Sequence, residues 1–150
     1  MIETIDLKIP PRPEYISVAR LTAAAVAARR AFTYDQIEDL KVAVSEACNV
    51  IIGSRRGSGD PIALHFIGAA DALDIRIETL GSGAGSGAAF PDLRSPGRRN
   101  ETTADTRALG VFLMQCLVDE VRRINGDGGV ALRLRKKQRE RSGGNPSSAR

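Results

Sequence analysis

The sequence predicts an α/β fold, a two-layer sandwich in which about three helices cover one face of a mixed β-sheet. Three stretches repeat apolar residues at the three- and four-residue spacing of a helix that buries one side. Four or five shorter stretches alternate apolar and polar residues, which is typical of half-buried strands. The connections are mostly too local for the crossovers of a Rossmann-type sheet, so we expect the helices and strands to pack as two layers.

Composition predicts one compact domain followed by a basic tail. A chain of 150 residues, 42% of them hydrophobic, can bury one core and is too short for two ordinary domains. We place the domain at residues 1–135 and expect residues 136–150 to form a disordered tail. Cations crowd this end of the chain, at Arg133, Arg135, Lys136, Lys137, Arg139 and Arg141. Such a tail can contact nucleic acid or an acidic protein surface, but it lacks interleaved aromatic residues, so we favour a solvated end.

The cysteines and the hydropathy pattern predict the compartment. Cys48 and Cys116 both lie in apolar helical patterns, which indicates buried thiols in a reducing environment rather than a disulfide. No apolar run approaches the ~20 residues that a membrane helix needs, and the first residues are unlike a signal peptide. We therefore expect a cytoplasmic protein that does not enter a membrane.

The first two elements are a strand and an alanine-rich helix. Apolar and polar residues alternate over residues 2–9, and Pro10, Pro11 and Pro13 end that strand. Residues 15–31 carry apolar residues at helical spacing among many alanines, and Pro13 suits the first turn of such a helix.

A second helix is predicted over residues 34–52, because Thr33 and Gln36 form a capping box before a long apolar stripe. The stripe consists of Ile37, Leu40, Val44, Ala47, Cys48 and Ile51. Glu46 lies roughly opposite the stripe, and no cation stands three or four residues away to pair with it. Two interpretations remain open: a solvated residue on the outer face, which periodicity alone favours, or a carboxylate retained for chemistry.

Two strands follow, over residues 62–67 and 73–77, joined by a short turn at residues 68–72. His65, the only histidine of the chain, falls on the polar side of the first of these strands. No second histidine, cysteine or carboxylate stands at metal-ligand spacing from it in the sequence, so we expect an ordinary strand residue rather than a ligand or catalyst.

A glycine-rich segment, residues 81–87, comes directly after the second of these strands. Glycine allows a backbone to approach phosphate groups closely, which makes the segment a candidate phosphate-binding loop, but a flexible linker has the same composition. The sequence contains no P-loop pattern. The lid that continues from it, residues 86–107, need not be ordered without a ligand.

The last elements are an apolar helix that runs into a short strand over residues 109–121, a turn at residues 125–129 and a strand from Val130 to Leu134. The final strand alternates apolar residues with charged ones, so one of its faces is expected to lie against the helices. These elements complete the predicted sandwich.

Two stretches resemble one protein family closely: residues 11–48, PRPEYISVARLTAAAVAARRAFTYDQIEDLKVAVSEAC, and residues 109–121, LGVFLMQCLVDEV. They are similar to the anti-sigma factor serine kinases of bacterial partner-switching systems, which are small histidine-kinase-like ATPases of the GHKL, or Bergerat-fold, group. The resemblance covers about residues 5–135. It implies the Bergerat fold, ATP and Mg²⁺ as cofactors, a sigma factor or an anti-anti-sigma STAS-domain protein as partner, and a homodimer.

The resemblance also implies roles on the second helix. Glu46 matches the general base for the serine hydroxyl of the protein substrate. The Mg²⁺-binding asparagine of the family falls on Val50, whose side chain cannot hold a metal. Asn49 comes one residue early, about 100° round the helix, and would serve as the metal ligand only in a shifted register.

The nucleotide-binding positions of the family are only partly matched. The candidate nucleotide-binding residues at or beside these positions are Asn49, Thr79, Gly81, Gly83, Gly110 and Gly129. Thr79 replaces the aspartate of the first glycine box and can accept a hydrogen bond without the charge that strengthens it. Ala108 replaces the first glycine of the second box, and Val130 replaces the threonine of the late glycine-threonine pair.

These substitutions predict a degenerate kinase, in which the fold and the protein-binding surfaces are kept while ATP binding and phosphorylation are weak or lost. Whether the chain is an enzyme is therefore left open. One alternative is an active ATP-dependent protein-serine kinase that uses Asn49 and phosphorylates an anti-anti-sigma factor. A further alternative is a pocket that now takes a different nucleotide or a signalling molecule.

Overall fold

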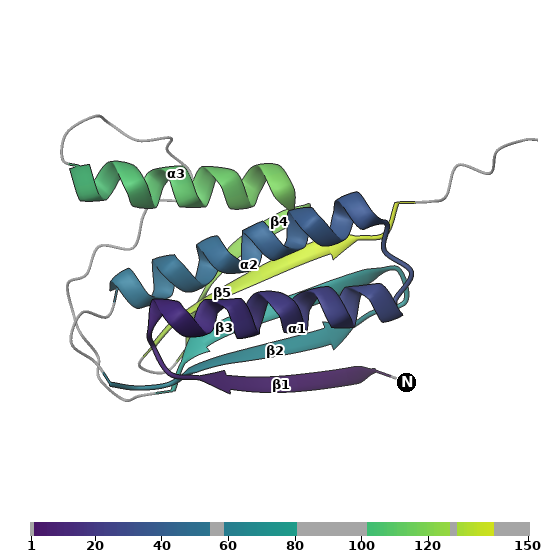
Figure 1. Cartoon of the computed structure of the whole chain (residues 1–150), viewed down its shortest axis with the longest axis horizontal. Helices are drawn as coiled ribbons and strands as arrows, with labels where there is room; N and C mark the ends of the chain where they lie inside the picture. Colours follow the sequence, from purple (N-terminus) through teal and green to yellow (C-terminus); the bar gives the residue numbers. More distant parts are fainter. Residues whose placement is uncertain (1, 55–58, 81–101, 127–128, 140–150) are drawn as a thin grey trace, which may run out of the picture.

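A five-stranded sheet lies beneath three α-helices that all cover the same face (Figure 1). The computed structural model describes residues 2–54, 59–80, 102–126 and 129–139. The elements, in chain order, are β1 (Glu3–Ile9), a short 3-10 turn (Pro13–Tyr15), α1 (Ile16–Arg29), α2 (Tyr34–Ser54), β2 (Ile62–Gly68), β3 (Ala72–Thr79), α3 (Thr102–Leu117), β4 (Glu120–Gly126) and β5 (Gly129–Lys137). The predicted two-layer sandwich is confirmed. No helix in the described ranges is long and apolar enough to span a membrane.

The strand directions differ from the predicted mixed sheet. The strand order is β1-β2-β3-β5-β4, and every neighbouring pair among the described strands is antiparallel. A pair of helices, α1 and α2, joins β1 to β2, so the chain runs back and forth over the sheet and returns antiparallel. The strands β3 and β4 do point the same way, but β5 lies between them and pairs with both.

The strands bury the alternating residues that the sequence predicts. Their inward faces are fully buried against the helices and carry Ile62, Leu64, Phe66, Leu73, Ile75, Ile77, Leu132 and Leu134. Because side chains alternate across a strand, the intervening polar residues face away from the helices. Burying an aliphatic or aromatic side chain of this size is worth about 1.5–3 kcal/mol, so this layer is the main source of the fold's stability.

The predicted capping box at the start of α2 is confirmed. The backbone amide of Gln36 donates to Oγ1 of Thr33 at 3.3 Å, and the backbone amide of Thr33 donates to Oε1 of Gln36 at 3.2 Å. The Gln36 side chain is buried, and its Nε2 donates a hydrogen bond to the carbonyl of Lys137 on β5 at 2.9 Å. The cap therefore fixes the start of α2 to the last strand.

The predicted domain boundary at residue 135 falls two residues short of the end of β5. Lys136, which we placed in the tail, is buried with 7% of its surface exposed. It lies on the same face of β5 as Leu134, and its ammonium group is 3.4 Å from Oδ2 of Asp39 on α2. The same group donates to the carbonyl of Leu117, the last residue of α3. Residues 140–150 of the predicted tail lie outside the described residues.

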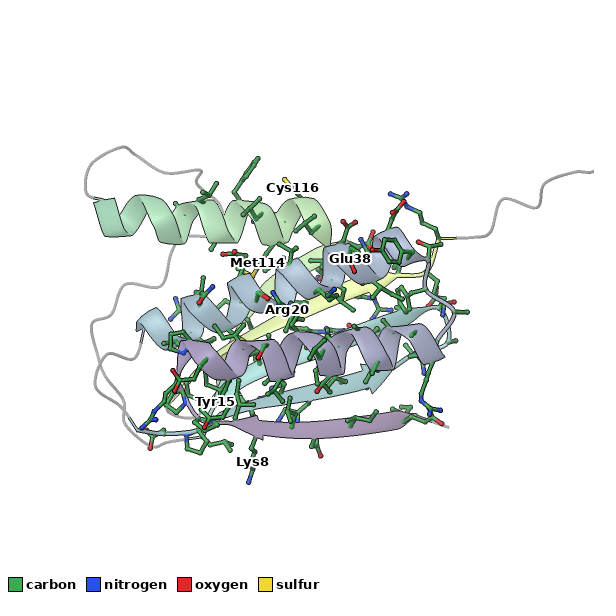
Figure 2. The ribbon with its side chains drawn as sticks, viewed as in Figure 1. Lys8, Tyr15, Arg20, Glu38, Met114 and Cys116 are labelled. Carbon is green, nitrogen blue, oxygen red and sulfur yellow. The ribbon has the colours of Figure 1, made fainter. Side chains whose placement is uncertain are left out.

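The two cysteines have different environments. Cys48 is buried in α2, as predicted, and burial raises the pKa of its thiol to about 12. Cys116 is exposed, which corrects the prediction of a second buried thiol. Helix α3 packs its other side, including the fully buried Met114, toward α2 (Figure 2). Apolar neighbours in the sequence therefore do not imply burial for a residue on the outward side of this helix.

His65 faces away from the helices, on the outer surface of the sheet, as predicted. Its Nδ1 lies 2.6 Å from Oδ1 of Asp6 on β1, and its Nε2 lies 3.1 Å from Oε1 of Glu78 on β3. The hydrogen bond to Asp6 is the main cause that raises the pKa of His65, with Glu78 adding to it and burial opposing it. Arg76, the residue opposite His65 on β3, is ion-paired with Glu78.

We expect this cluster to make the stability of the fold depend on pH. Because the pKa of His65 is higher in the folded state, its contribution is fully present below the unfolded pKa of about 6.5 and is lost as the pH rises through the folded value. Urea denaturation should show wild type losing stability relative to His65→Gln over that window. In an Asp6→Asn background, the stability difference between His65 and His65→Gln should change less with pH. A difference in the free energy of unfolding that stays constant at all pH values would contradict the link between His65 and Asp6.

Candidate functional site

The candidate site lies where α2 packs against α3, around Glu46. Glu46 is half-buried in the second half of α2, and Gly110 is buried on α3. A Cβ atom built on Gly110 would be 2.9 Å from Oε2 of Glu46 and 3.8 Å from Cγ2 of Val50. The carboxylate therefore lies directly against the backbone of α3. It is neither on the fully solvated outer face of α2 nor in the apolar core.

Val50, and not Asn49, accompanies Glu46 in this contact. Residues four apart lie on the same side of a helix, and Val50 is one turn beyond Glu46, with 3% of its surface exposed. Asn49 is exposed and points to a different side of α2. The structure thus places an isopropyl group, and not a carboxamide, beside the Glu46 carboxylate.

The other predicted nucleotide positions are placed only in part. Thr79 ends β3 opposite Ile62 of β2 and is half-buried on the face that carries Ile77. Gly129 is the first residue of β5 and pairs with Gly126. Gly81 and Gly83 lie outside the described residues, as does most of the predicted lid. The second half of α2 and the end of β3 lie at the same end of the sandwich (Figure 1).

The chemistry available around Glu46 is limited by its neighbours. Within the described residues, no ion pair to Glu46 is formed, and no group of three histidine, cysteine or acidic side chains is arranged to hold a metal. The basic side chain nearest along α2 is Lys41, which pairs with Glu38 at 2.9 Å. A carboxylate without a cation partner can accept a proton from a hydroxyl group that is brought within hydrogen-bond distance.

Sequence reasoning did not foresee the contact between Glu46 and Gly110. The available signal was the absence of a side chain at residue 110 within a strongly apolar helix, since a helical glycine without a packing reason costs about 1 kcal/mol relative to alanine. The burial of Lys136 was also missed, because a lysine within a basic run is usually a solvated charge. The available signal was its alternation with Leu134, which places Lys136 on the inner face of the strand.

We expect Gly110→Ala to lack the stabilisation of about 1 kcal/mol that alanine usually gives over glycine in a helix, or to destabilise the protein slightly, because the added methyl group must displace the Oε2 end of the flexible Glu46 side chain. The absence of that gain would report the contact rather than helix propensity. The double variant Glu46→Ala with Gly110→Ala should recover the gain in urea denaturation. Leu109→Ala, at the exposed neighbouring position, is the control. An equal effect of Gly110→Ala with and without Glu46 would contradict this interpretation.

The fold and this site define the class of the protein. The family described as the histidine kinase-like ATPase domain matches residues 9–136, and the chain belongs to it. Proteins named serine-protein kinase RsbW are similar over nearly the whole chain. The one from Bacillus pumilus (strain SAFR-032) is 35% identical over 145 residues, which cover 90% of this chain and 86% of the relative. The one from Bacillus subtilis (strain 168) is 33% identical over 136 residues, covering 88% and 84%.

A solved structure supports the same fold at a greater distance. The RsbU and RsbW domains of a Mycobacterium tuberculosis protein match 91% of this chain with a TM-score of 0.63 and 14% sequence identity. The chain spans 32% of that larger protein. The family resemblance inferred from residues 11–48 and 109–121 is thus confirmed.

Proposed function

We propose that this protein is a partner-switching regulator that binds a sigma factor or an anti-anti-sigma STAS-domain protein and has weak or lost ATP binding. The relatives named serine-protein kinase RsbW support the regulatory class. The proposal of weak or lost ATP binding is supported mainly by Val50, which is buried beside Glu46 at the position where a metal-binding carboxamide would be needed. The protein-binding role needs only the folded surface.

The described residues do not fit a Mg²⁺-ATP site of the family's kind. Val50 offers no oxygen ligand, and Asn49 is exposed on a different side of α2. Thr79 can accept a hydrogen bond but carries no charge. Each lost hydrogen bond to a charged or buried polar group is worth about 1.5–3 kcal/mol, so two or three losses weaken ATP affinity by on the order of a thousandfold or more.

An active protein-serine kinase is the second candidate, and the position of Glu46 favours it. The carboxylate is half-buried and has no cation partner within the described residues, which is the arrangement that a general base requires. In this alternative Asn49 would have to reach the metal from the exposed side of α2.

Calorimetry with Mg²⁺-ATP separates the two candidates. We expect negligible binding by wild type and a gain of at least tenfold in Mg²⁺-dependent affinity for Val50→Asn, because the new carboxamide lies one turn from Glu46. Asn49→Ala is the matched control and should change nothing. Tight binding by wild type that Asn49→Ala abolishes, together with serine phosphorylation that Glu46→Ala abolishes, would establish the kinase instead.

The partner proposal is tested by co-purification with the sigma factor and the STAS-domain protein encoded nearby. We expect a stable complex with at least one of them in the absence of ATP, and we expect Glu46→Ala to retain it. A complex that forms only with ATP present would contradict the proposal, as would the absence of any complex.

We further propose that the protein works as a homodimer.

A further inference from the structure

The face of the sheet that the helices leave uncovered carries a row of three arginines across the neighbouring strands β3, β5 and β4 (Figure 1). Arg76 on β3 lies directly opposite Arg133 on β5, and Arg133 lies directly opposite Arg122 on β4. The residues that follow and precede them, Ile77 and Leu132, are fully buried toward the helices, so the guanidinium groups lie on the outer face. Like charges directly opposite each other destabilise a sheet, so nearby carboxylates must offset this row.

Each of these arginines, and Arg135 beside them, pairs with a carboxylate that is less exposed than the arginine is. The exposed fractions of the arginine and carboxylate side chains are 37% and 13% for Arg133 with Asp74, 26% and 13% for Arg135 with Asp74, 41% and 24% for Arg76 with Glu78, and 67% and 31% for Arg122 with Glu120. The guanidinium groups therefore shield the carboxylates, and the surface presents positive charge to the solvent. We call Arg76, Arg122, Arg133 and Arg135 the arginine face.

The ion pairs hold the arginine face in place without using all of its hydrogen-bond donors. Asp74 accepts from Nη2 of Arg133 at 3.2 Å and from Nη1 of Arg135 at 2.9 Å, so one carboxylate serves two arginines. A guanidinium group has five N–H donors in a planar fork, and one carboxylate engages at most two of them. Side chains already held in one geometry lose less conformational entropy when a ligand binds. The face therefore has donors left for further anions and a low cost of ordering.

Lys137 extends the arginine face along β5. Arg133, Arg135 and Lys137 project from the same side of this strand, because side chains alternate along it and the residues between them are buried. Residues two apart on a strand are about 6.8 Å apart, which sets the spacing of these three cations. Carboxylates on alternate residues of an extended peptide have the same spacing. An extended acidic segment laid along β5 therefore matches the cations one to one.

We propose that the arginine face and Lys137 bind an acidic segment of a partner protein, in an extended conformation with carboxylates at alternate residues. The carboxylates meet the cations of β5, and Arg122 and Arg76 on the flanking strands supply further N–H donors. This surface lies on the opposite side of the sheet from the helices that carry Glu46. The inference therefore goes beyond the proposed function and needs no nucleotide.

The same face fits a protein segment better than a single-stranded nucleic acid. Proteins that bind single strands stack the bases on aromatic rings, and this stacking contributes strongly to affinity. The outer side of the described strands carries no phenylalanine, tyrosine or tryptophan. Guanidinium forks match carboxylates in geometry as well as in charge, so an acidic peptide uses what the face offers.

Fluorescence anisotropy with a labelled peptide of alternating glutamate and serine tests the surface. We expect the full-length wild type to bind at low salt, and we expect Arg122→Gln to weaken binding roughly tenfold, because an exposed guanidinium fork is lost. Arg12→Gln is the matched control, since the Arg12 side chain is 70% exposed and paired with Glu14, away from the sheet face. It should leave the affinity unchanged. No binding by wild type, or equal weakening by both variants, would overturn the proposal.

A gain of binding separates the proposal from an effect on folding. Glu120→Gln should tighten binding about threefold, because it removes the carboxylate that competes for Arg122. Affinity should fall as the salt concentration rises. Unchanged or weaker binding by Glu120→Gln would count against the surface, and so would tighter, Arg122-dependent binding of a labelled oligo-deoxythymidine of equal charge.

These measurements use neither ATP nor a sigma factor. Failure of the proposed regulatory function would therefore leave peptide binding unchanged, and failure of the arginine face would leave calorimetry with Mg²⁺-ATP unchanged.

Discussion

The position of α2 depends on the contacts that its first turns make with β5. Gln36 caps the helix and bonds to the Lys137 carbonyl, and three residues later Asp39 meets the buried ammonium group of Lys136. The same ammonium group binds the last carbonyl of α3. One end of the sheet thus sets the positions of two helices. Glu46 and Gly110 lie on the same two helices, about two turns away from these contacts with β5. The contact between Glu46 and Gly110 therefore depends on the contacts with β5 as well.

Much of the architecture follows from local patterns. Alternation over β2, β3 and β5 predicted the large apolar residues that pack against the helices, and the three-residue spacing of Thr33 and Gln36 predicted the start of α2. These predictions succeed because they depend on the periods of the strand and the helix alone. Strand direction was not predictable in that way. Whether β4 lies beside β3 or beyond β5 is decided by packing across the sheet, which no single stretch records.

The candidate site was predictable as a set of residues and less so as an arrangement. Glu46 was identified from its place on α2 and from the family resemblance, but the sequence alone left open whether it was solvated. Its half-buried position depends on α3 passing close by, where the missing side chain of Gly110 leaves room for Oε2 of Glu46. Cys116 was expected to be buried and is exposed. An apolar helix predicts a buried face, but which residues form that face depends on where the neighbouring helix lies.

The difference between the two cysteines has a practical consequence. Cys48 is buried and its thiol stays protonated at neutral pH, since burial raises its pKa to about 12, so it does not react readily. Cys116 is exposed, and the chain has two cysteines in all. A thiol-specific fluorophore will therefore attach to α3 and leave α2 unlabelled. The native chain already carries a single reporter position on the helix that faces Glu46, from which movements of that helix can be followed without altering the sequence.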